Sequence, residues 1–233
     1  MNDTAVQLLP CPIHDEGAGL MLADSKLISF ERFTKTAVWP AYAGCIWALL
    51  YAVFVRFYQA AGGPIGMAGE PVDLEAFYMA SYIAGVEIVL CGFILIGLVK
   101  PWGKVLPQWV PFLGGRKIPR LVVLLPTLVF TAFLLAHGVA GIVTKALYLG
   151  GVITMHFTGW SVLDAHSLAL WDLLFYEPWF VIMGVLSGLT ASHYAQATCG
   201  SLAAWRRNTI YYLIAVFLLT ALMVYMIIDQ FAR

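Results

Sequence analysis

Two glutamates, Glu87 and Glu177, fall inside long apolar stretches of the sequence, where an ionisable side chain is rare. A charged side chain within a membrane span costs about 2.5–3.5 kcal/mol on insertion scales, so such residues usually face a bundle interior, a partner or a water-filled cavity. Because neither glutamate reaches the membrane surface easily, we expect at least one to be uncharged near neutral pH. Proton binding is therefore one chemistry that they could perform, as a coupled pair if the two carboxyl groups approach each other.

The same two glutamates also have a purely structural interpretation. An uncharged carboxyl group can hydrogen bond to a tyrosine, to a serine or to a backbone carbonyl that a helix kink has freed. Such a bond would hold helices together without any exchange of protons. Both interpretations stay open at the level of the sequence.

Further ionisable residues lie closer to the same membrane surface, which we take as the outer one. With a rise of about 1.5 Å per helical residue, Arg56 and Asp172 lie roughly 6 Å below that surface and His137 roughly 9 Å. Glu177 and Glu87 lie deeper, at roughly 13 and 16 Å. Together these groups predict an outward-facing ligand or proton pocket between helices, made of Arg56, Glu87, His137, Lys145, Asp172 and Glu177.

The shallower members of this set each have an ordinary explanation. The long stem of Arg56 allows its guanidinium group to reach the interface, and Asp172 either does the same or pairs with Arg56. A single histidine supplies no coordination set, so His137 fits a hydrogen-bonded position in a bundle better than a metal ligand. Lys145 shares a helix face with His137 and could simply anchor the end of its helix.

Transmembrane helices are the elements that must position these residues. Apolar residues make up 61% of the 233-residue chain and charged residues 11%, well below the roughly 25% charged content of soluble domains. Five apolar stretches reach the about 20 residues that a helix needs to cross a bilayer. We therefore predict an all-α, polytopic bundle with spans near residues 38–60, 76–98, 121–143, 168–190 and 210–228.

The chain is expected to contain one folded domain. Residues 1–35 form a polar head, in which an interfacial helix is expected from about residue 24 to 35, and residues 36–233 form a single transmembrane domain. No basic start followed by an apolar core is found near the beginning of the sequence, so we expect no cleaved signal peptide.

Basic residues occur in alternate loops and predict the orientation of the bundle. Lys26, Arg32 and Lys35 precede the first span, five basic residues lie between the second and third spans, and two arginines lie between the fourth and fifth. Cytoplasmic loops carry an excess of such residues, so the N-terminus is expected inside and the C-terminus outside. The net charge of zero gives no reason to expect a nucleic-acid partner.

Patterns of known catalytic and metal-binding sites are not found in the sequence. There is no Glu-x-x-His pair for a di-iron bundle, and no HExxH, GxSxG or P-loop pattern. A bis-histidine haem needs two histidines at matching depths, whereas His137 and His193 lie toward opposite ends of their spans. The cysteines have no metal-binding spacing and none falls in an outer loop. We therefore expect no metal, no cofactor and no structural disulfide.

Several local features indicate how the helices bend and pack. The third apolar run continues to about Ile153, which predicts an interfacial segment from about residue 147 to 160; a tilted, overlong helix is the alternative. Pro126 and Pro178 lie within spans and predict kinks. Gly184 and Gly188 form a GxxxG pair that permits close approach of another helix.

Five short motifs carry a resemblance to a known family. They are WALLY at 47–51, GGPIG at 62–66, VKPWG at 99–103, LWD at 170–172 and PWF at 178–180. In this combination the chain resembles a bacterial family of small multi-pass membrane proteins without an assigned function. The resemblance covers roughly residues 45–190, omits the polar head and the fifth span, and implies a bacterial plasma-membrane location. It supplies no catalytic or binding residues.

Three classes of function are compatible with these observations. The first is a ligand-binding or accessory membrane subunit with an outward-facing polar pocket. The second is a small proton-linked transporter that uses Glu87 and Glu177. The third is an intramembrane enzyme that acts on a lipid-like or quinone-like substrate, with His137 or Glu177 as acid or base. The first is favoured, because spans without a catalytic motif offer more helix surface than chemistry. Its expected partners are membrane lipids and other membrane subunits or further copies of the chain.

Overall fold

The computed structural model describes residues 21–105, 108, 111–112, 114–198 and 201–232. The chain divides into two compact units, residues 1–33 and 34–233. Helix α1, Met21–Thr36, covers the region where the head helix was expected. The remainder of the polar head, with Cys11, lies outside the described residues, and so does Cys199.

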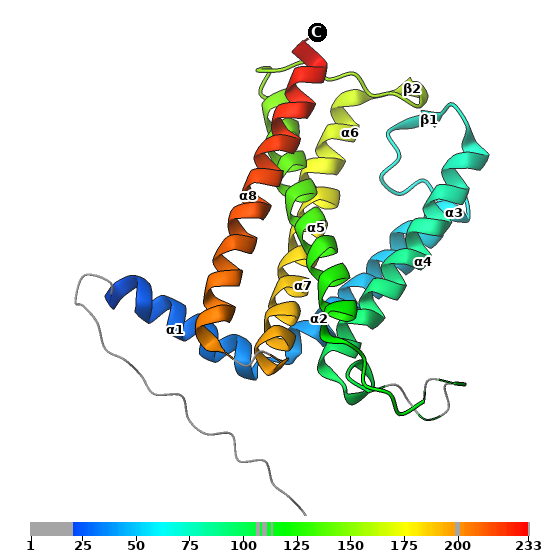
Figure 1. Cartoon of the computed structure of the whole chain (residues 1–233). Helices are drawn as coiled ribbons and strands as arrows, with labels where there is room; N and C mark the ends of the chain where they lie inside the picture. Colours follow the sequence, from blue (N-terminus) through cyan, green and yellow to red (C-terminus); the bar gives the residue numbers. More distant parts are fainter. Residues whose placement is uncertain (1–20, 106–107, 109–110, 113, 199–200, 233) are drawn as a thin grey trace, which may run out of the picture. The chain divides into compact units, whose positions relative to one another are not determined.

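Five helical stretches among the described residues are long and apolar enough to cross a membrane, and they fit a multi-pass membrane protein (Figure 1). This confirms the all-α, polytopic class that the sequence predicts. The first span consists of α2 (Trp39–Tyr51), a π-helical turn (Ala52–Phe57) and α3 (Tyr58–Ala60). The second is α4 (Leu74–Val99) and the third is α5 (Arg120–Leu149). The fourth joins α6 (Ala165–Trp171), a second π-helical turn (Asp172–Tyr176) and α7 (Glu177–Thr198), and the fifth is α8 (Leu202–Ala232).

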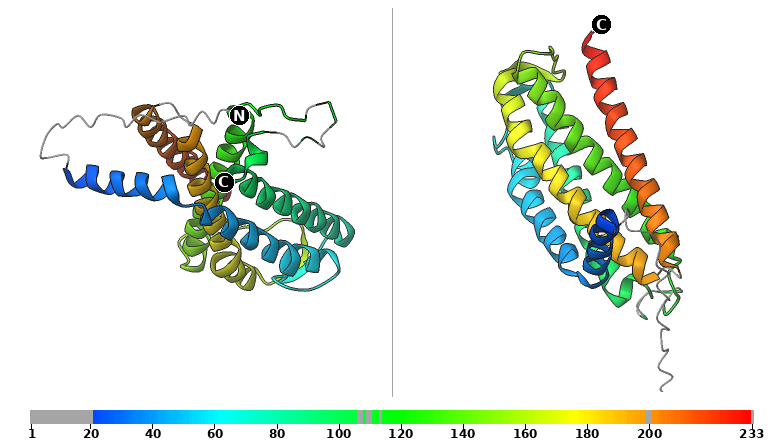
Figure 2. Two further views of the ribbon diagram at one scale, coloured as in Figure 1. Left: turned by 90° about the horizontal axis from the view of Figure 1, so that it is seen from below. Right: turned by 90° about the vertical axis from the view of Figure 1, so that its left-hand side faces the viewer.

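Helix α5 lies between α7 and α8. It packs against α7 on one side and α8 on the other, and α2 packs against both α4 and α7 (Figure 2). The buried core between these helices includes Tyr51, Leu98, Leu134, Met183 and Tyr194. Helix α8 is mostly exposed, which in a membrane places its apolar side chains against lipid.

Pro178 accounts for the π-helical turn in the fourth span. Proline has no backbone N–H to donate, and its ring crowds the carbonyl group four residues earlier, which here belongs to Leu174. Widening the helix from Asp172 to Tyr176 relieves this crowding. By contrast, α5 remains α-helical through Pro126.

A small antiparallel sheet joins two loops at one end of the bundle. Strand β1 (Gly69–Pro71) leads into α4, and strand β2 (Trp160–Leu163) leads into α6; Gly69 pairs with Leu163. A Cβ atom at Gly69 would overlap the carbonyl oxygen of Val162, so glycine allows this close pairing. We call this end of the bundle the sheet end.

Of the interfacial segment that we expected near residues 147–160, the first three residues belong to α5 and Trp160 begins β2; its position in the interface stays a prediction. Helix α5 continues to Leu149, and the chain then follows an irregular path to β2. The residues of the third apolar run that exceed one span thus first extend α5, as in the alternative of an overlong helix. The remaining residues lead toward β2.

Helix α6 begins at a side-chain cap outside the spans. Asp164 accepts hydrogen bonds from the backbone N–H of Ser167 at 3.1 Å and from its hydroxyl group at 2.6 Å. These bonds favour the charged carboxylate and hold the pKa of Asp164 below its ordinary value.

Replacing Asp164 by alanine should lower the melting temperature at pH 7, because the first turn of α6 loses its cap. Since the pKa of Asp164 is lowered on folding, its contribution is complete above the unfolded value of about 4 and disappears as the pH falls through the lowered value. Thermal unfolding in detergent between pH 7 and pH 3 measures both effects. The Asp164→Asn variant should keep the cap at pH 7 and lose this part of the pH dependence; an Asp164→Ala variant with the wild-type pH profile would contradict the assignment.

Candidate functional site

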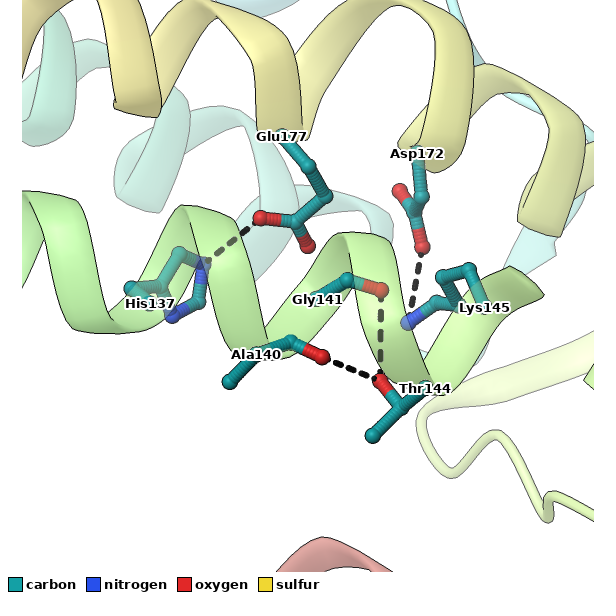
Figure 3. A network of polar contacts seen from close by, with 7 residues as sticks. All are labelled: His137, Ala140, Gly141, Thr144, Lys145, Asp172 and Glu177. Atoms are coloured by element: carbon teal, nitrogen blue, oxygen red, sulfur yellow. Dashed lines mark hydrogen bonds and ion pairs between the residues drawn. The ribbon is translucent and has the colours of Figure 1, made fainter. Parts of the chain in front are cut away.

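Two ionisable pairs lie one above the other between α5 and the fourth span (Figure 3). Nearer the sheet end, the Nζ atom of Lys145 is 3.1 Å from Oδ2 of Asp172. Deeper in the bundle, Nε2 of His137 is 3.8 Å from Oε2 of Glu177. We call these four residues the polar ladder.

The π-helical turn places Asp172 and Glu177 on one face. In an α-helix, side chains five residues apart are rotated by about 140°, so only one of them would face α5. A π-helix bonds residue i to residue i+5 and has more residues in each turn than an α-helix, so two side chains five residues apart are rotated from each other by less. Because the turn spans Asp172–Tyr176, both carboxyl groups reach α5.

Glycines on α5 make room for the deeper pair. A Cβ atom at Gly141 would overlap the carboxyl group of Glu177, and one at Gly138 would lie 2.9 Å from its backbone carbonyl oxygen. Small residues allow two helices to approach closely in a membrane. The carboxyl group is consequently buried, with 6% of the Glu177 residue surface exposed.

The buried carboxyl group lacks a full set of hydrogen bonds. Among the described residues, no donor lies within hydrogen-bond distance of Oε2 of Glu177, and 3.8 Å to His137 is too long for such a bond. The hydroxyl group of the nearby Thr144 donates to Ala140 and Gly141 backbone oxygens instead, at 2.9 and 3.2 Å. A buried oxygen without a donor costs about 1–3 kcal/mol, so its retention needs a reason.

The imidazole ring of His137 connects this carboxyl group with the bundle surface. It stacks on Phe133 at 5.5 Å and meets the edge of Phe180 at 4.6 Å between ring centroids. Its side chain is 38% exposed, whereas that of Glu177 is 8% exposed. A group able to carry a proton thus reaches from the buried carboxyl to the outside of the helix pair.

Lys145 and Asp172 form the second pair of the polar ladder, which is a conventional ion pair. Their side chains are 13% and 20% exposed, and the ammonium group also lies 5.3 Å from the Phe157 ring centroid. Each charge is neutralised by the other, so the pair brings no net charge into the spans. Asp172 therefore pairs with Lys145, in place of the Arg56 partner considered from the sequence.

Arg56 lies on the first span, apart from the ladder. Its guanidinium carbon is 5.5 Å from the Tyr51 ring centroid, and its Nη1 atom is 3.5 Å from Oε1 of Gln59. Gln59 in turn donates to the hydroxyl oxygen of Tyr176 at 3.0 Å and to the Ile65 carbonyl oxygen at 2.9 Å. These bonds tie the first span to the residue that precedes Glu177.

Glu87 does not join Glu177. Its side chain is exposed on α4 and makes no hydrogen bond or ion pair with any described residue. The structure thus brings four of the six predicted site residues together, and leaves Arg56 and Glu87 elsewhere.

A separate apolar cavity lies between the first and fourth spans. Its volume is about 400 Å³, and the rings of Tyr51 and Trp179 stack within its wall at 4.0 Å between centroids. The lining residues are Trp47, Leu50, Tyr51, Phe54, Val55, Leu174, Phe175, Pro178, Trp179 and Ile182. The cavity could not be predicted from the sequence, because its aromatic and aliphatic residues look like any other part of a span.

Comparison with protein-family models, curated proteins and solved structures finds no match for this chain. The resemblance to a bacterial family of small membrane proteins therefore stays a prediction. The class of protein is defined by the fold and the site themselves: a multi-pass helical membrane protein with a polar ladder between two spans.

Gly141→Ala should destabilise the protein by about 1–3 kcal/mol, because the added methyl group forces α5 away from the Glu177 carboxyl group. Unfolding in mixed detergent and denaturant measures the change in free energy. Gly188→Ala is the matched control, since its Cβ would meet only the Thr131 methyl group at 3.3 Å. Adding Glu177→Ala to Gly141→Ala should relieve part of the loss; strictly additive effects would show that the two residues do not contact each other.

Proposed function

We propose that this chain is a small proton-linked membrane carrier in which Glu177 binds and releases a proton and His137 passes that proton toward the bundle surface. The observation that carries the proposal is the buried Oε2 atom of Glu177, which lacks a hydrogen-bond donor and lies 3.8 Å from His137. Ionisable residues inside spans commonly mark proton pathways, and a carboxyl–histidine pair is a recurrent part of them.

The chemistry of the pair supports proton exchange. A charged carboxylate in this apolar setting is costly, so the resting form of Glu177 carries the proton. When the O–H group of Glu177 releases the proton to the free Nε2 lone pair of His137, an ion pair replaces two neutral groups. An imidazole ring can accept a proton at one nitrogen and donate one from the other, which suits it to take up and pass on the proton.

The helix around the site supports movement between two arrangements. Single π-helical turns occur frequently at functional sites, and the turn ahead of Pro178 lies directly before Glu177. A shift of the turn by one residue would rotate the carboxyl group relative to α5. The Lys145–Asp172 pair lies on the sheet-end side of Glu177 and would shield it from that side.

The location and orientation of the carrier form part of the proposal. We infer a bacterial plasma membrane, with the N-terminus in the cytoplasm and the sheet end outside. The alternation of basic loops supports this orientation. In this arrangement the polar ladder would lie nearer the outer surface, with Lys145 and Asp172 as its outer pair.

Proton flux in reconstituted vesicles tests the function. With a pH-sensitive dye inside the vesicles and a potassium-driven voltage, wild-type protein should change the internal pH, and Glu177→Gln should reduce the initial rate at least about tenfold. His137→Ala should slow the flux while leaving proton binding by Glu177 intact.

Glu75→Gln serves as the control, because it removes a carboxyl group from the exposed first turn of α4. Its flux should equal that of the wild type. Wild-type flux in the Glu177→Gln variant would overturn the proposal, provided that both variants show the wild-type melting temperature.

Binding of a lipid-like ligand is the second candidate function, and the apolar cavity favours it. A volume of about 400 Å³ with aromatic walls suits an acyl chain or a flat ring system. A fatty acid with a photoactivatable alkyl group should label Phe54 or Phe175 of the cavity. Leu50→Trp, which fills the cavity, should reduce labelling severalfold, whereas Leu218→Trp on the exposed surface of α8 should not. Equal labelling of both variants would count against this function.

A further inference from the structure

Glu87 is an ionisable residue on the outer surface of a membrane-spanning helix. It lies thirteen residues after Leu74 and twelve before Val99, so it is at the middle of α4, about 20 Å from the sheet-end start of the helix. Its side chain is exposed, and no described residue of the chain supplies a hydrogen bond or an ion pair. A glutamate is too short to reach the membrane surface from this depth, so in an isolated chain it would face hydrocarbon.

The surrounding face of α4 has the spacing of a helix–helix seam. Exposed residues recur at alternating intervals of four and three, the pattern with which two helices pack along their length. The seam consists of Ala76, Ala80, Ile83, Glu87, Leu90 and Ile94. Ile83, Leu90 and Ile94 are 49%, 57% and 47% exposed, so none of them is used for packing inside the bundle.

The other side of α4 already has its partners. Its buried residues include Gly85, Gly92 and Leu95, and the helix packs there against the first and fourth spans. A Cβ atom at Gly92 would lie 3.0 Å from the Ala48 side chain, and one at Gly85 would overlap the Phe57 ring more closely still. The seam lies on the opposite, exposed side of α4 and points away from the bundle.

We propose that two copies of this chain pair through their α4 seams, side by side and in the same orientation, with the two Glu87 carboxyl groups hydrogen bonded to each other at the centre. In a two-fold pairing each seam residue meets its own counterpart at the same depth. A protonated carboxyl group has one donor and further acceptor capacity, so the counterpart of Glu87 supplies the partner that is not found among the described residues of one chain.

The composition of the seam fits a second copy. Glu87 is the only ionisable residue of the six, so no other polar group in the seam needs a partner. Ala76 and Ala80 lie four residues apart toward the sheet end, and small residues with this spacing let two helices approach closely. The larger aliphatic residues Ile83, Leu90 and Ile94 then pack on either side of the carboxyl pair.

Cysteine cross-linking in vesicles tests the geometry. In a background with the four native cysteines replaced by alanine, Ile83→Cys and Leu90→Cys should each form a disulfide-linked dimer on mild oxidation. Tyr82→Cys is the matched control, because Tyr82 is 55% exposed but is rotated by about 100° from Ile83. It should cross-link at least about tenfold more slowly.

Energy transfer between labelled copies in vesicles of defined lipid-to-protein ratio tests the role of the carboxyl group. Glu87→Leu should raise the dissociation constant about tenfold through loss of the interhelical hydrogen bonds. Glu87→Gln, whose amide also has a donor and an acceptor, should stay within about threefold of the wild type.

Three results would each overturn the proposal. A wild-type chain that is monomeric at every protein density would show that something other than a second copy covers Glu87. Equal cross-linking at Tyr82 and Ile83, or a Glu87→Leu variant that pairs as tightly as the wild type, would show that the seam is not the interface. The pairing does not depend on proton transport, because it is measured without a proton gradient.

Discussion

Inside a bilayer, an ionisable side chain can hydrogen bond or pair only with protein groups, because the hydrocarbon core contains no water and lipid tails have no polar atoms. Ionisable residues inside the spans meet this constraint in different ways. Lys145 and Asp172 neutralise each other, and Glu177 is enclosed between two helices beside His137. Among the described residues, none provides such an arrangement for Glu87. The first arrangement pairs both charges, whereas the other two leave hydrogen-bonding capacity unused among the described residues.

Enclosing Glu177 depends on two departures from a regular pair of helices. The π-helical turn aligns Glu177 with Asp172, and the missing side chain at Gly141 leaves space for its carboxyl group. Both departures are needed to enclose the carboxyl group. Without the π-helical turn, only one of the two carboxylates would face α5, and a larger residue at position 141 would force the helices apart. Pro178 explains the first departure, so one proline and one glycine together determine the shape of the site.

The number of spans and the identity of the polar residues could be predicted from the sequence, because lengths of apolar sequence and isolated charges are visible in it. The pairing of these residues could not. A regular helix would turn Asp172 and Glu177 to different faces, and nothing local announces a π-helical turn except the proline that follows. Nor could the exposed position of Glu87 be inferred, because lipid is as apolar as the bundle interior and α4 is apolar on all sides. The β1–β2 sheet was hidden for another reason: its partners are about ninety residues apart and each strand is only three or four residues long.

The small sheet also has a mechanical consequence. Backbone bonds from Asp164 to Ala68 at 2.8 Å and from Val72 to Gly159 at 3.0 Å extend the pairing beyond the two strands. The segments that lead into α4 and into α6 are thus hydrogen bonded to each other. A displacement of either helix along its axis would therefore also displace the other. Movement of the fourth span would then be restricted to the residues that follow the sheet. This part would bend most easily at the π-helical turn before Pro178. The sheet would hold the start of the fourth span in place, and Glu177 lies close to the point where the span would bend.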